Sequence, residues 1–220
     1  MYFLIEYLPL ILRGFLVTVQ MTFFGVILGL GLGTLLAIGD LYGGRVLSII
    51  IKFYVEFFRG SPLIIQLFIF YYSIPNLLGI LIDNHTVGLI VFTLNSAAYQ
   101  KGYIKGAMES VFEDQMTAAL SLGLSKAQSI RHVVLPQAMR VVIPAWSNEF
   151  ASMAKSTAAL LVIAVPELTS NLKAIASWTW RVLETYSFGA LIYLIWISVV
   201  MKILDIIYNK VKIPEIEITA

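Results

Sequence analysis

The sequence contains a series of apolar segments, each long enough to cross a lipid bilayer. A transmembrane helix needs about 20 mostly apolar residues to cross about 30 Å of hydrocarbon. The sequence predicts an all-α integral membrane protein with five such helices. They are expected at residues 10–38, 46–74, 86–105, 141–165 and 188–208.

The composition agrees with a membrane protein. The 220 residues are 59% hydrophobic and 13% charged, whereas a soluble domain carries about 25% charged residues. A chain with so few charges would not keep a soluble surface wet. No internal repeat, low-complexity tract or flexible linker interrupts residues 1–220, which we therefore expect to form a single domain.

The second segment contains the helix-breaking sequence Arg59-Gly60-Ser61-Pro62. Pro62 removes a backbone donor and disfavours helix at Ser61. We expect one long, Pro-broken helix, because residues 46–58 alone are too short to cross. The alternative is two spans within residues 46–82. Broken helices often line transport paths, but Pro kinks are also ordinary packing features.

The distribution of basic residues predicts the orientation, because cytoplasmic loops carry the excess of Lys and Arg. With the N-terminus outside, eight basic residues fall inside and three fall outside. The inner set is Arg45, Lys101, Lys105, Lys126, Arg131, Arg140, Lys210 and Lys212, and the outer set is Arg13, Lys173 and Arg181. The C-terminus is then cytoplasmic.

Three glycines in the first span have the spacing of a helix-packing seam. Gly25, Gly29 and Gly33 form a doubled small-xxx-small pattern, which lets a second helix approach closely. The alternative is that Gly is simply frequent in membrane helices.

Residues 108–138 form a polar loop between the third and fourth spans. Glu113 or Asp114 is a candidate N-cap for a first short helix, because acidic residues suit a helix start. Gly123 fits the left-handed position that ends such a helix. We therefore expect a helix from residue 113 or 114 to the glycine.

A second short helix follows the glycine. Ser125 and Gln128 have the Ser-x-x-Gln spacing of a capping box, and Leu135-Pro136 is expected to end the helix. The topology places this helix–turn–helix in the cytoplasm, where a soluble partner can reach it. The alternative is a surface loop that happens to be helical.

The residues exclude disulfide chemistry and give no support for a metal site, nucleic-acid binding or nucleotide binding. There is no Cys, and His85 and His132 lie far apart with no ligand-like spacing. The formal charge of +2 does not indicate nucleic-acid binding. The sequence lacks the phosphate-binding pattern G-x-x-x-x-G-K-[ST]. If an energy source drives this protein, that energy must come from another polypeptide, through a surface such as residues 108–138.

Several motifs, in order over about residues 50–170, resemble permeases of ATP-binding-cassette importers, in the branch for polar amino acids. Thr117-Ala118-Ala119-x-x-Leu122-Gly123-Leu124, followed by Leu135-Pro136-Gln137-Ala138, is similar to the EAA loop of that family. Tyr54–Leu63 resembles its FRGTPL segment. The remaining matches are Asn95–Tyr99, Gly106–Val111, Asn148-Glu149-Phe150, Lys155-Ser156-Thr157 and Val165–Thr169.

The resemblance implies a type I importer permease fold in which residues 108–138 form a coupling helix that docks on an ATPase subunit. It implies a second permease subunit, an extracytoplasmic amino-acid-binding protein and surrounding lipid as partners. ATP and Mg would be bound by the partner ATPase, with no cofactor and no enzyme activity in this chain. The implied coupling residues are Glu113, Asp114, Thr117, Ala118, Ala119, Leu122, Gly123 and Leu124.

The sequence departs from the family pattern at three places. Thr117 replaces the Glu for which the EAA motif is named. Lys101-Gly102-Tyr103 replaces the usual Ala-Glu-Ile, and Ser156 stands where an acidic residue is common. The first difference concerns the contact with the ATPase, and the third removes a counter-charge that a dibasic amino acid would use.

Polar side chains in the third and fourth spans predict a substrate site, because such groups are costly in lipid and usually face a cavity. Glu149 is a candidate acceptor for an ammonium group. Alternatively, these groups bond to one another between helices, and Lys155 snorkels to an interface. The candidate substrate-binding residues are Asn95, Ser96, Glu149, Ser152, Lys155, Ser156 and Thr157.

We therefore expect the transmembrane subunit of an ATP-driven importer that carries a polar amino acid by alternating access. The alternative from another class is a secondary transporter driven by an ion gradient through Glu149 and Lys155. A structural membrane scaffold is a third possibility, but it does not account for the polar face in the fourth span.

Overall fold

The computed structural model of the chain describes residues 2–212, apart from the side chains of residue 2 and residues 112–114. The described residues are helical and contain no strand, which agrees with the predicted all-α class. The helices are α1 (Tyr2–Glu6), α2 (Leu8–Tyr42), α3 (Gly44–Gly60), α4 (Leu63–Phe68), the π-helical η1 (Ile69–Ser73), α5 (Ile74–Leu78), α6 (Asn84–Ser121), α7 (Lys126–Ser129), the π-helical η2 (Ile130–Val134), α8 (Leu135–Val141), α9 (Ile143–Ser156), the 3₁₀-helical η3 (Thr157–Ile163), α10 (Leu168–Thr179) and α11 (Val182–Val211).

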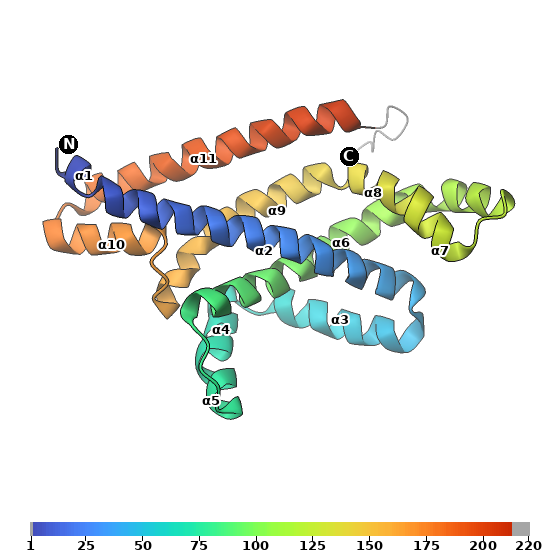
Figure 1. The fold of residues 1–220 in the computed structure, drawn as a ribbon, viewed down its shortest axis with the longest axis horizontal. Coiled ribbons are helices and arrows are strands. Elements are labelled where there is room, and N and C mark those ends of the chain that lie inside the picture. The colour runs from blue at the N-terminus through green and yellow to red at the C-terminus, as the bar shows by residue number, and fades with distance from the viewer. Residues whose placement is uncertain (1, 213–220) are drawn as a thin grey trace.

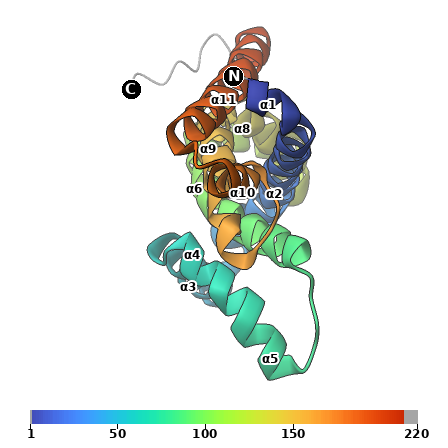
Figure 2. The same cartoon turned by 90° about the vertical axis from the view of Figure 1, so that its left-hand side faces the viewer.

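The long helices α2, α6, α9 and α11 run roughly along the longest axis of the molecule (Figure 1). The α2–α3 turn, α7 and α8 lie towards one end of that axis, and α1 and α10 lie at the other end. The segment from α4 to α5 leaves the bundle and projects to one side, as the end-on view also shows (Figure 2).

By length and composition, α2 and α11 are the two described helices that are able to cross a membrane by themselves. The number rises to four if each of two bent pairs forms one span. The expected third span lies in α6, where Asn95, Gln100 and Lys101 interrupt the apolar run. The number of five spans therefore stays a prediction.

The expected second span is bent far more strongly than a simple kink. The axis of α3 makes an angle of 107° with that of Leu63–Leu78. Ser61 and Pro62 separate the two helices and have extended backbone angles. The sequence locates the break correctly, but the two halves do not share an axis.

The glycine seam in α2 is confirmed, and its partner is α6. A Cβ atom at Gly29 would lie 2.8 Å from the Cβ of Ser96, and one at Gly25 would lie 3.0 Å from the Cβ of Phe92. A Cβ at Gly33 would lie 3.1 Å from the carbonyl oxygen of Ala97. Small residues at every fourth position therefore let the two helices pack closely.

The prediction of a helix start at Glu113 or Asp114 is wrong, because α6 runs unbroken from Asn84 to Ser121. An acidic residue caps a helix only where the preceding chain leaves the helical conformation. The actual N-cap is the exposed Asp83, whose side chain accepts a hydrogen bond from the backbone N–H of Thr86 at 3.0 Å. Hydrogen bonds from the side chain and backbone of Thr86 lower the pKa of Asp83.

The turn after α6 is the predicted one. Gly123 has a φ of 84°, in the left-handed region. The Ser125 side chain accepts a hydrogen bond from the backbone of Gln128, whose side chain bonds back to the backbone of Ser125. The glycine turn and the capping box are therefore confirmed.

The prediction that Leu135-Pro136 ends the second helix is wrong. The chain continues through α7, η2 and α8 as far as Val141. Pro136 lies in the first turn of α8, directly after the π-helical turn. The Leu135 N–H bonds to the Ile130 carbonyl five residues earlier, and a local π-helical adjustment of this kind lets a helix continue past a proline.

A buried ion cluster joins the α2–α3 turn to α6. The Asp40 carboxylate is 2.6 Å from the Lys101 ammonium and 2.9 Å from that of Lys105. Its other oxygen accepts a hydrogen bond from Ser48 in α3. The Lys126 ammonium lies 5.1 Å from the ring centre of Tyr42, so the same turn also contacts α7.

A second polar network lies at the other end of the bundle. Glu167 is the N-cap of α10 and accepts hydrogen bonds from the backbone N–H groups of Thr169 and Ser170 at 2.8 and 2.6 Å. Thr18 of α2 and Tyr193 of α11 also donate to it, at 3.4 and 3.3 Å. This carboxylate therefore ties three helices together.

Candidate functional site

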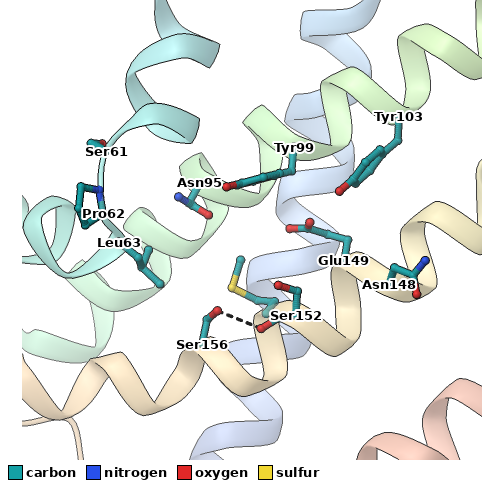
Figure 3. A pocket seen from close by; sticks show the side chains of 11 residues that line it. Ser61, Pro62, Leu63, Asn95, Tyr99, Tyr103, Asn148, Glu149, Ser152 and Ser156 are labelled. Carbon is teal, nitrogen blue, oxygen red and sulfur yellow. Dashed lines mark hydrogen bonds between the residues drawn. The ribbon is translucent and has the colours of Figure 1, made fainter.

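A cavity of about 470 Å³ lies between the α3–α4 break, α6 and α9. Figure 3 shows that its three walls come from these three parts of the chain. The lining residues are Ser61, Pro62 and Leu63 from the break, Asn95, Tyr99 and Tyr103 from α6, and Asn148, Glu149, Ser152, Met153 and Ser156 from α9.

Glu149 carries the acidic group of this cavity. Glu149 is 5% exposed, and its Oε1 accepts a hydrogen bond from the Ser96 hydroxyl at 2.8 Å. No basic side chain among the described residues forms a salt bridge with it. The carboxylate lies between the tyrosines of α6 and the serines of α9 (Figure 3). It is therefore available to a cationic group that enters the cavity.

Asn95 lines the cavity, but its amide N–H₂ group is already engaged. It donates to the backbone carbonyl of Phe58 at 3.2 Å and to the side-chain oxygen of Gln66 at 3.0 Å. Gln66 is fully buried and donates to the Phe58 carbonyl at 2.8 Å and to the Ser61 carbonyl at 3.0 Å. These two amides hold the broken wall against α6.

The hydroxyls of α9 lie one turn apart on the cavity side. Glu149, Ser152 and Ser156 share one helical face, as the sequence spacing predicts, and all three line the cavity. Ser156 donates to the backbone carbonyl of Ser152 at 2.9 Å (Figure 3). Ser152 is exposed in the cavity.

Three of the predicted site residues do not line this cavity. Ser96 lies behind Glu149 and is fully buried. Lys155 is exposed elsewhere on α9. Thr157 is fully buried and donates to the backbone carbonyl of Ala154 at 2.8 Å.

Seven of the eleven lining residues are not among the predicted substrate-binding residues. Two of the seven, Tyr99 and Tyr103, follow Asn95 at intervals of four residues and therefore share its helical face. That spacing could have identified them. The Arg59 guanidinium carbon lies 5.1 Å from the centre of the Tyr99 ring. A cationic group is therefore close to one wall of the cavity.

The expected coupling residues lie at the end of α6 and in the turn after it. Thr117, Ala118, Leu122 and Gly123 are exposed, Leu124 is half-buried and Ala119 is buried. The side chains of Glu113 and Asp114 lie outside the described residues. Within the part that the structure describes, no three His, Asp or Glu side chains gather as a metal site would require.

The family and the relatives that match this chain are all described as components of transport systems. Residues 25–212 match the family described as "Binding-protein-dependent transport system inner membrane component". A probable amino-acid ABC transporter permease protein of Vibrio harveyi is 35% identical over 193 residues, 87% of this chain and 86% of that protein. The arginine transport system permease protein ArtQ of Bacillus subtilis is 31% identical, covering 94% of this chain and 95% of that protein.

The same likeness extends to solved structures. A chain of an amino acid ABC transporter crystallised with histidines has a TM-score of 0.85 and 31% identity, over 94% of this chain and 97% of that chain. A chain of the inward-facing methionine transporter MetNI has a TM-score of 0.76 at 20% identity, over 94% and 99%. The second match concerns the fold alone.

Proposed function

This chain belongs to the family of binding-protein-dependent transport system inner membrane components, and we propose that it forms the translocation pathway for a polar amino acid. It is a membrane permease subunit of an ATP-driven importer and not itself an enzyme. The observation that carries the substrate proposal is the cavity with the Glu149 carboxylate, which has no salt-bridge partner among the described residues.

The chemistry of the cavity suits a solute with an ammonium group. The Glu149 carboxylate is an acceptor in a buried setting, where a charged hydrogen bond is stronger than in water. Hydroxyls of Ser152, Tyr99 and Tyr103 surround the same space and are suited to donate to a carboxylate. A volume of about 470 Å³ is large enough for an amino acid and several waters.

The proposed topology has five spans, at 10–38, 46–74, 86–105, 141–165 and 188–208, with the N-terminus outside. The arrangement of charged groups supports it. Arg45, Lys126 and Arg140 belong to elements that lie towards one end of the molecule (Figure 1), whereas Lys173 and Arg181 belong to the opposite end. A positive cytoplasmic end is the usual orientation signal.

We propose that residues 108–138 dock on the ATPase subunit and transmit its closure to the cavity. The α6 helix supports this role, because it carries Asn95 and Tyr99 in its first half and Thr117 and Ala118 at its end. A displacement of the exposed end therefore reaches the cavity wall through one continuous helix. ATP and Mg would be bound by the ATPase alone.

The remaining proposed partners are a second permease subunit, identical or similar, and an extracytoplasmic amino-acid-binding protein. Both proposals follow from the family's dependence on binding proteins and from its transporter assemblies. The projecting α4–α5 segment and the apolar outer face of α3 offer surface for a second subunit.

Reconstitution into proteoliposomes tests the proposal. We expect uptake of L-glutamine or L-arginine that requires ATP and a separately added ATPase subunit. Uptake on a proton or sodium gradient alone would instead support the secondary transporter. A panel of amino acids, scored by stimulation of the ATPase activity, then identifies the cargo. Stimulation by non-amino-acid solutes only would contradict the substrate proposal.

A further inference from the structure

We propose that Gln100 is a positioning residue for the substrate site, because it fixes the direction in which the Ser96 hydroxyl donates and thereby holds the Glu149 carboxylate. This inference rests on the proposed role of Glu149 in binding an ammonium group. Gln100 lies in α6, is fully buried and does not line the cavity itself.

The hydrogen bonds define a chain that crosses three helices. The Gln100 Nε2 atom is 2.8 Å from the backbone carbonyl oxygen of Val26 in α2 and 2.9 Å from the Ser96 Oγ. The Ser96 Oγ is in turn 2.8 Å from the Glu149 Oε1 in α9. The chain therefore runs from the α2 backbone through two α6 side chains to the cavity.

The donor and acceptor of each hydrogen bond in this series follow from the Val26 carbonyl at its beginning. A carbonyl oxygen only accepts, so the Gln100 atom next to Val26 must be the amide nitrogen. The same nitrogen has a second N–H, which points to the Ser96 oxygen. Because that oxygen accepts from Gln100, the single proton of the Ser96 hydroxyl is left for Glu149.

Three other serines in the helices of this protein form a local bond instead. The hydroxyls of Ser121, Ser147 and Ser156 each donate to the backbone carbonyl four residues earlier. This local bond is the usual alternative for a serine inside a helix. The hydroxyl of Ser96 instead points across to α9, and the Gln100 amide is the group that holds its oxygen in place.

The bond from Ser96 stabilises the charged form of the Glu149 carboxylate and fixes its orientation. Burial penalises a carboxylate, and a donor offsets part of that cost. The bond from Ser96 occupies Oε1 and leaves the other oxygen on the cavity side, without a hydrogen-bond partner among the described residues. A carboxylate held in this way is ready for an incoming ammonium group and needs no reorganisation.

The close packing of α2 explains why Gln100 is held firmly. A Cβ at Gly29 would lie 3.1 Å from the Gln100 Nε2, and one at Gly33 would lie 3.1 Å from its Cβ. The glycine seam therefore brings the Val26 carbonyl within reach of the amide. In this way the packing of two helices determines the direction of one hydroxyl in the site.

The test is a double-mutant cycle in the reconstituted full complex, with uptake of L-glutamine or L-arginine, whichever the wild type takes up faster. Gln100→Met keeps the approximate size but removes the donor. We expect the half-saturating concentration to rise about three- to tenfold, with the maximal rate per assembled complex nearly unchanged. In the Ser96→Ala background, the same substitution should have no further effect.

Gln66→Met is the matched control, because Gln66 is an equally buried amide without a bond to Ser96. Its effect should be additive with Ser96→Ala. If Gln100→Met has the same effect with and without Ser96, or changes the maximal rate alone, the positioning role is wrong. If Glu149→Gln leaves the half-saturating concentration unchanged, the substrate site itself is wrong.

Discussion

The Gln66 amide nitrogen lies 2.8 Å from the backbone carbonyl oxygen of Phe58. In a continuous helix, that carbonyl would accept from the N–H of the residue four positions later, which is Pro62 and has none. Gln66 therefore supplies the hydrogen bond that proline removes. The Asn95 amide adds a second donor to the same carbonyl at 3.2 Å, so the strong bend leaves no unsatisfied acceptor at that position.

We expect Gln66→Leu to destabilise the protein, because the Phe58 and Ser61 carbonyls lose a buried donor. The cost of a buried group without its partner is about 1–3 kcal/mol. The measurement is the midpoint of thermal unfolding in detergent. Gln115→Leu is the control, because Gln115 is exposed at the end of α6. Equal midpoints for the two variants would contradict the role of Gln66 in holding the break.

We expect Glu149→Gln to raise the half-saturating amino-acid concentration about 10- to 100-fold, because hydrogen bonds to charged groups contribute about 1.5–3 kcal/mol. The amount of assembled complex should not change. Uptake into proteoliposomes at graded concentrations gives the value, and the yield on purification reports assembly. The control is Glu109→Gln, at a largely exposed carboxylate. An unchanged half-saturating concentration removes Glu149 from the site.

We expect Gly29→Ala to loosen the packing of α2 on α6, because the new Cβ would lie 2.8 Å from that of Ser96. Overpacking of this kind costs about 1–3 kcal/mol. Gly31→Ala is the matched control in the same helix, since nothing lies within 4 Å of its Cβ position. The midpoint of thermal unfolding should be lower for Gly29→Ala than for Gly31→Ala. A Gly29→Ala midpoint at or above that of Gly31→Ala would contradict close packing at the glycine seam.

We expect Asp40→Asn to destabilise the α2–α3 turn, because two lysine ammonium groups would lose their shared carboxylate. Removal of one partner from a buried ion cluster costs about 3–5 kcal/mol. The double variant Asp40→Asn/Lys101→Met should recover part of the loss, since Lys105 keeps Glu109 at 3.8 Å. The measurement is the midpoint of thermal unfolding in detergent for the wild type, the single variant and the double variant. No recovery in the double variant would show that the charges are not coupled.

We expect Gly123→Ala to weaken binding of the ATPase subunit, because an alanine at a φ of 84° costs about 1–2 kcal/mol. The turn that presents the α6 end and α7 would then change shape. Gly106→Ala is the control, at a helical glycine with open space around it. Co-purification of the ATPase subunit measures the effect. Full retention with Gly123→Ala would argue against docking at this turn.

The cavity shows where sequence reasoning succeeds. The spacing of Glu149, Ser152 and Ser156 places them on one helical face, and they line the cavity together because helical periodicity is a local property. The left-handed Gly123 and the Ser125–Gln128 capping box were also predictable, since both depend on residues within one turn. Hydropathy alone was sufficient to predict a helical membrane protein.

The errors arose where local signals compete with the surrounding chain. Glu113 and Asp114 are good N-cap residues, but α6 is already helical before them and continues past them. Pro136 is a helix breaker in an interior position, yet it directly follows the π-helical η2, and the helix continues. The capping or helix-breaking tendency of a residue does not show whether the preceding turn is already helical.

Composition and spacing within one helix are enough to locate the apolar segments, the break at Pro62 and the helical face of Glu149. The packed structure is needed to show that α6 is the partner of the glycine seam, that the break bends by 107° and that Gln66 donates to the Phe58 carbonyl. It also shows that Gln100 connects Val26 to Ser96. These relationships join residues on different helices, and their hydrogen bonds depend on distances that only packing sets.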